Sequence, residues 1–232
     1  MRKIYFLFLF TLLPSLTALP HFNYPPANAV NTTTTYTSIS GTGTAITTAN
    51  NDDANSAAIN IGFTLNFNGT GYTQFIFNTN GFIKLGSTAP TSAAIFGTNA
   101  QNGTGNILLN TSYPANGNAI AVMNHDLEGT GTTSYFIETT GLAPNRVTTI
   151  EWKDVMEKTT SPAEQYSLMN FQIKLYETTN NIELVYGTWT PTANTDAFKT
   201  NAVGIVGSTN TAGNVIMVTK SSAGAWSTAA FG

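Results

Sequence analysis

The chain has 232 residues, of which 41% are hydrophobic, 11% aromatic and only 9% charged, and its formal net charge is -3. It contains no cysteine, which excludes disulfides, thiolate metal sites and cysteine nucleophiles. Its nine lysines and arginines form no cluster, which excludes the basic surface that nucleic-acid binding requires.

The N-terminal segment has the layout of a secretory signal peptide. Arg2 and Lys3 precede an apolar run of ten residues, 4–13, which Pro14 ends, and small residues lead to Ala18. This run is shorter than the roughly 18 apolar residues that cross a bilayer, and no later stretch approaches that length. We therefore predict a signal peptide at residues 1–18, and a mature chain that is secreted or held at the cell surface with no transmembrane segment.

The mature chain begins with a stretch that resembles a linker. Residues 19–35 contain two adjacent prolines and four consecutive threonines, a composition that predicts an extended leader. Residues 36–232 are then predicted to form a single domain. This domain is interpreted either as the whole mature protein or as the first part of a longer one.

The rest of the chain reads as β-structure. Its 40 threonines favour strands, and its 26 asparagines, together with glycine, favour the turns between them. Apolar and polar residues alternate over 59–67, which indicates a half-buried strand, and Asn80-Gly81 is a strong hairpin signal. Further strands are predicted at 119–123, 133–138, 146–152, 166–177, 182–189, 202–206 and 215–219, and a long surface excursion at 86–106. The predicted fold is all-β, a two-layer antiparallel β-sandwich of about ten to twelve strands.

Several segments of this pattern resemble a known extracellular module. They are 52–53 (DD), 59–63 (INIGF), 72–86 (YTQFIFNTNGFIKLG), 143–152 (APNRVTTIEW), 171–177 (FQIKLYE), 182–187 (IELVYG) and 202–207 (AVGIVG). Over roughly residues 36–230 the chain resembles the N-terminal β-sandwich of large exported and surface proteins of gliding Gram-negative bacteria. More distantly, its layout is similar to the extracellular domain of nidogen. Either resemblance implies an extracellular interaction module with no known catalysis.

Two oxygen-rich segments are candidates for metal binding. Asp126 lies in the polar stretch 124–128, and Asp52 and Asp53 lie in the polar stretch 50–56. Calcium takes six to eight oxygen ligands, so neither segment is sufficient alone. The structural alternative is that these aspartates cap turns through hydrogen bonds to backbone N–H groups. If the two loops meet in space, Asp52, Asp53 and Asp126 are predicted to share a calcium ion, and no other cofactor is expected.

Catalysis is not supported by the pattern. Glycoside hydrolysis would need two facing carboxylates, and Glu151 and Glu183 are the candidates within strands. The alternation predicts that both side chains point to solvent or to a cross-strand lysine such as Lys174. With no GxSxG motif and only His125 as a histidine beyond the leader, we predict that the chain is not an enzyme.

Aromatic residues supply the principal alternative function. Tyr176, Tyr186 and Trp189 lie close to one predicted hairpin and could present rings to a sugar. The first expectation is an exported non-enzymatic module for adhesion or scaffolding at the cell surface or in the extracellular matrix, with an extracellular protein or glycan as partner. The alternatives are a carbohydrate-binding module and an appended domain of an extracellular hydrolase.

Overall fold

A computed structural model describes residues 23–92, 108, 116–158, 164–194, 203–209, 213–219 and 230–231. The predicted signal peptide and most of the predicted excursion at 86–106 lie outside the described residues. Within the described part, no helix has the length and apolarity that a bilayer crossing needs. Between residues 23 and 43, the described chain has one 3-10 turn, η1 (Pro26–Asn28), and otherwise no helix or strand.

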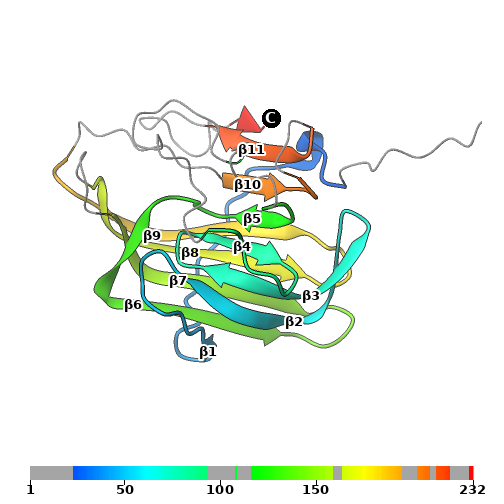
Figure 1. Cartoon of the computed structure of the whole chain (residues 1–232), viewed down its shortest axis with the longest axis horizontal. Helices are drawn as coiled ribbons and strands as arrows, with labels where there is room; N and C mark the ends of the chain where they lie inside the picture. Colours follow the sequence, from blue (N-terminus) through cyan, green and yellow to red (C-terminus); the bar gives the residue numbers. More distant parts are fainter. Residues whose placement is uncertain are drawn as a thin grey trace, which may run out of the picture.

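Twelve strands in the described residues form two antiparallel sheets that lie face to face (Figure 1). The five-stranded sheet has the order β1-β6-β7-β8-β9, and the seven-stranded sheet has the order β12-β11-β10-β5-β4-β3-β2. The predicted two-layer antiparallel β-sandwich and its number of strands are confirmed. The strands are β1 (Thr44–Ala45), β2 (Asn55–Phe67), β3 (Thr70–Asn78), β4 (Phe82–Leu85), β5 (Ala119–Ala121), β6 (Leu127–Thr140), β7 (Val147–Glu157), β8 (Tyr166–Tyr176), β9 (Ile182–Pro191), β10 (Val203–Val206), β11 (Val215–Thr219) and β12 (Ala230–Phe231).

The alternation in β2 places its apolar side chains on one face. Ile61, Phe63, Leu65 and Phe67 are buried, while the polar residues between them are exposed. This is the period-two burial that a strand with one face on the core requires. The sequence prediction for 59–67 is therefore confirmed, and β2 starts four residues earlier than predicted.

In the core, Trp152 of β7 packs between the two sheets and contacts both. Its ring stacks on Phe77 of the opposite sheet at a centroid distance of 4.5 Å and on Phe171 of its own sheet at 5.5 Å. Its indole Nε1–H donates to the carbonyl oxygen of Asn78 at 3.0 Å. Because the indole N–H finds a partner in the opposite sheet, the ring can be fully buried at little polar cost.

Residues 36–39 pack on the outer face of the five-stranded sheet, and this corrects one prediction. Glu151 is fully buried, whereas the alternation had predicted that it faces solvent or a lysine. Its carboxylate accepts hydrogen bonds from the Tyr36 hydroxyl at 2.5 Å, the Ile39 N–H at 3.2 Å and the Gln172 side chain at 3.0 Å. The prediction that Glu151 and Trp152 lie on opposite faces of the strand is correct, because Trp152 does face the core. Residues 36–39 lie over the face that carries Glu151, and the alternation of apolar and polar residues cannot predict such a cover.

Candidate functional site

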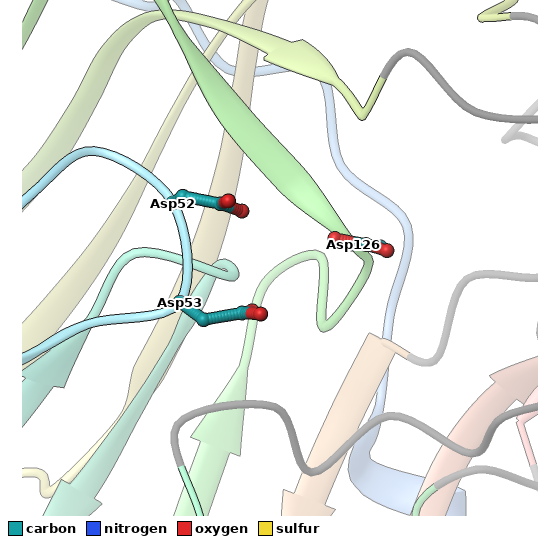
Figure 2. Close-up of side chains that lie close together, drawn as sticks. All are labelled: Asp52, Asp53 and Asp126. Atoms are coloured by element: carbon teal, nitrogen blue, oxygen red, sulfur yellow. The ribbon is translucent and has the colours of Figure 1, made fainter.

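Three carboxylates converge where two loops meet. Asp52 and Asp53 precede β2, Asp126 precedes β6, and one carboxylate oxygen from each lies within 4.8 Å of the others. Figure 2 shows all three side chains pointing into the same space. Like charges at such distances repel by between about 1 and 4 kcal/mol per pair, depending on solvent exposure. The calcium prediction required the two loops to lie close together, and in the structure they do. Calcium binding itself stays a prediction.

Asn80 ties the two loops together, a role that the sequence did not reveal. Its side-chain amide donates to Asp53 Oδ1 at 2.8 Å, and its side-chain carbonyl accepts from the Leu127 N–H at 2.9 Å. The side chain is fully buried, so these bonds replace water on both sides of the carboxamide. The sequence indicated only a hairpin turn at Asn80-Gly81, because a turn motif says nothing about where the side chain reaches.

Lys158 brings a positive charge to the three aspartates. Its Nζ donates to Asp52 Oδ2, and its backbone N–H donates to the Asp126 carbonyl oxygen at 2.9 Å. Burial lowers the pKa of Lys158, but the hydrogen bond and charge of Asp52 and the charges of Asp126 and Asp53 outweigh it, so the pKa is raised. Lys158 follows β7 directly, and nothing in the sequence linked it to the acidic loops.

The charge of Asp52 also affects a buried hydroxyl on β6. Tyr135 of β6 is 4% exposed, and its hydroxyl has no hydrogen-bond partner among the described residues. Burial and, after it, the charge of Asp52 raise the pKa of Tyr135. Asp52 Oδ1 is also a buried oxygen that no described residue bonds.

His125 belongs to a neighbouring pair and not to the three acids. Its Nε2 lies 3.9 Å from Glu157 Oε1, and both side chains are almost fully buried. Glu157 also accepts a hydrogen bond from the Gln165 N–H at 2.6 Å. Among the described residues, the group that could share a metal ion consists of oxygen ligands only.

The three predicted carbohydrate residues, Tyr176, Tyr186 and Trp189, are all partly buried. Tyr186 and Trp189 pack against the core, and Trp189 meets Tyr186 edge-on at 5.8 Å. The Tyr186 hydroxyl donates to the Val122 carbonyl oxygen at 2.8 Å. Tyr176 donates to Glu183 Oε2 at 2.6 Å, and burial followed by this bond raises the pKa of Tyr176 to about 12.

A groove of about 1030 Å³ brings two of these tyrosines together. It is lined by the leader, the β8–β9 turn, and strands β9, β10 and β11. In Figure 1, β10 and β11 are drawn above β9. Tyr176, Tyr186 and Glu183 line it from one side, and Ile205 and Ile216 line it from the seven-stranded sheet. Trp189 is not part of its lining. The groove includes Asn66, near the end of β2, whereas the acidic cluster lies before its start.

The fold and these features define an all-β sandwich with polar loops at one end of β2 and an open groove at the other. The chain belongs to the NIDO-related family, whose model matches residues 28–231. This match covers nearly all of the described sandwich and confirms the predicted nidogen-like layout; the gliding-bacteria context stays a prediction. Comparisons with curated proteins and with solved structures gave no match.

Proposed function

We propose that this chain is an exported, non-enzymatic module that mediates adhesion or scaffolding at the cell surface or in the extracellular matrix. The observation that carries the proposal is the NIDO-related match over residues 28–231, which supports an extracellular interaction module. The N-terminal charge and hydropathy pattern supports export through a signal peptide cleaved near Ala18.

The buried state of Glu151 further supports a non-catalytic role. Glu151 and Glu183 were the carboxylates that could have formed a glycosidase pair. Glu151 is fully buried under residues 36–39, and Tyr36, Ile39 and Gln172 all donate to it. A general acid or nucleophile must reach the substrate, and this carboxylate has no route to one.

Export and binding can be tested together. Residues 19–232 would be purified and their binding to panels of extracellular-matrix proteins and cell-envelope polysaccharides measured by biolayer interferometry. N-terminal sequencing of the native protein from surface and medium fractions would locate the cleavage site. Saturable binding to a protein, with a mature N-terminus near residue 19, supports the proposal. An uncleaved cytoplasmic protein, or release of new reducing ends from a polysaccharide, contradicts it.

The groove supports carbohydrate binding as a second candidate function. It combines the tyrosines 176 and 186 with the polar residues Asn66, Asn180 and Asn181, and rings beside amides suit the apolar faces and hydroxyls of a sugar. Tyr176→Ala removes a ring that is not part of the packed core. If a glycan is the ligand, we expect glycan-array binding to fall at least tenfold in this variant. Leu142→Ala, at a side chain that is 85% exposed on the β6–β7 turn, is the matched control.

A further inference from the structure

Strand β9 has one edge with which no other described strand pairs. It ends the five-stranded sheet, and its only strand partner among the described residues is β8. Beyond that pairing, the backbone of residues 182–185 makes no hydrogen bond within the described part of the chain. An open edge of this kind presents a row of N–H and C=O groups to which another strand can pair.

The groove lies along this open edge. Ile182, Glu183 and Leu184 all line it, although successive side chains of a strand point to opposite faces of the sheet. Ile182 and Leu184 pack against the core, so Glu183 belongs to the outer face. A cavity that meets three consecutive residues of one strand therefore lies beside the edge of that strand and not over one of its faces.

The floor of the groove is apolar and belongs to the seven-stranded sheet. Four aliphatic side chains of that sheet line the groove, and they form two directly opposed cross-strand pairs. They are Val203 and Ile205 of β10 and Ile216 and Val218 of β11. The Tyr186 hydroxyl of β9 bonds to the Val122 carbonyl just after β5, and β10 and β11 follow β5 in the sheet order. The seven-stranded sheet therefore continues past β9, where the other sheet has no further described strand.

One carboxylate and the size of the groove indicate what would fit. Glu183 is the one charged residue among the described lining residues. The Tyr176 hydroxyl donates to it, and no lysine or arginine of the described chain forms an ion pair with it. The spacings along a strand, between strands and between sheets give each strand residue about 160 Å³. A groove of about 1030 Å³ thus has room for a strand of about six residues.

We propose that this groove binds an extended peptide segment of a partner protein, which adds to β9 as the sixth strand of its sheet. The side chains that the segment turns toward the floor would be aliphatic, and one on its other face would be a lysine or arginine beside Glu183. The inference rests on the proposed function, because it names the class of partner that the interaction module would hold. A glycan in the same groove is an outcome of the test.

The probe is a peptide selected against the purified chain from a random display library. Its sequence should alternate aliphatic residues with others that include a lysine or arginine. Two N-methylated forms then test strand pairing, because alternate residues of a strand direct their N–H groups to opposite edges. Methylation of one alternate set should abolish binding, and methylation of the other set should preserve most of it. Equal effects of the two sets, or a library that yields no such peptide, would overturn the proposal.

Substitutions in the chain test the two faces of the bound strand. Val218→Thr keeps the shape of the floor but adds a hydroxyl, and it should weaken peptide binding about tenfold. Val215→Thr, on the face of β11 that packs against a different cluster, is the matched control and should change nothing. Glu183→Gln should weaken binding about threefold and reduce its dependence on salt. Glu138→Gln, outside the lining of the groove, is the control for that charge.

The outcomes distinguish this inference from the proposed function. A partner protein that binds the wild type and Val218→Thr equally would overturn the strand site and leave the adhesion function standing. A glycan whose binding falls in Val218→Thr, or a dimer of the chain that this substitution dissociates, would overturn it as well, because the groove then has another occupant. Loss of peptide binding in Val218→Thr and in one methylated form, with both controls unchanged, supports it.

Discussion

Arg146 shows how a single side chain connects the two sheets. Its guanidinium forms a two-pronged ion pair with Glu177, through Nε at 2.8 Å and Nη2 at 2.5 Å, and Nη1 donates to the Gly62 carbonyl of β2 at 2.6 Å. The same group lies over the Phe63 ring, 5.7 Å from its centroid. Gly62 has a φ of +98° at an irregularity of β2, so Arg146 holds the strand at the point where its pairing with β3 is interrupted.

This ion pair predicts a particular dependence of stability on pH. The hydrogen bond from Arg146 lowers the pKa of Glu177 below its ordinary value of 4.5. A carboxyl with a lowered folded-state pKa stabilises the fold above its unfolded-state pKa, and this contribution is lost as the pH falls through the folded-state value. Glu177→Gln should therefore lower the melting temperature at pH 7, and the difference from wild type should shrink between about pH 4.5 and pH 2.

The measurement is a series of thermal melts from pH 2 to pH 8. Glu138→Gln on β6 serves as the control, because it removes a charge without removing an arginine ion pair of the described structure. If the difference in melting temperature between Glu177→Gln and wild type is the same at all pH values, the charge of Glu177 does not contribute to stability.

Among the elements, the β3–β4 hairpin does more than reverse the chain. Gly81 has a φ of +80°, and its carbonyl oxygen accepts hydrogen bonds from the Val122 and Met123 N–H groups, both at 3.0 Å. A Cβ at this position would lie 2.6 Å from the Met123 Cβ. The hairpin tip is thus packed against the chain that leads from β5 to Asp126, so its glycine is required both by backbone conformation and by space.

Two glycine-to-alanine variants separate these requirements. Gly69 in the β2–β3 turn has a φ of +74°, and a methyl group added there would meet nothing within 4 Å, so Gly69→Ala should cost only the conformational penalty of about 1 kcal/mol. Gly81→Ala should lower the free energy of unfolding by about 1–3 kcal/mol more than Gly69→Ala, because the added methyl group overpacks the hairpin tip. Urea denaturation measures both. Equal losses in the two variants would show that the hairpin tip is not tightly packed.

For the whole molecule, stability depends on the contact between the two sheets. Trp152 is the largest fully buried side chain of the described residues, and it stacks on one ring from each sheet while its indole N–H donates to Asn78 of the opposite sheet. Trp152→Ala should destabilise the fold by about 3–5 kcal/mol, a large part of the 5–15 kcal/mol typical of a domain.

Trp152→Phe should keep the stacking and lose mainly the hydrogen bond to the Asn78 carbonyl oxygen, which should lower the free energy of unfolding by about 1 kcal/mol. Urea unfolding followed by circular dichroism checks both values, and a loss below about 1 kcal/mol for Trp152→Ala would show that another contact dominates.

The success and failure of the sequence predictions follow from how far each interaction reaches. The strand at 59–67 and the hairpin at Asn80-Gly81 were predictable because alternation and turn chemistry act between near neighbours. The acidic residues of the candidate site were also visible as residue types. Their convergence was stated only as a condition, and the contributions of Asn80 and Lys158 were missed, because each depends on contacts made far along the chain.

The burial of Glu151 illustrates the same division. The sequence correctly put Glu151 and Trp152 on opposite faces of one strand, since a strand has a period of two. Only the tertiary structure decided that residues 36–39 cover the outer face and turn a predicted solvent-facing acid into a buried acceptor.

By itself, the sequence determined that this chain forms strands, which residues of the strand at 59–67 face the core, and that the result is a layered β-sandwich. These properties follow from local periodicity and turn residues, which need no knowledge of distant segments. Only the tertiary structure decided which loops meet at Asp52, Asp53 and Asp126, and which strands and leader residues enclose the groove. The physical reason is that a site is set by the packing of two whole sheets, and this packing brings together residues that no local pattern connects.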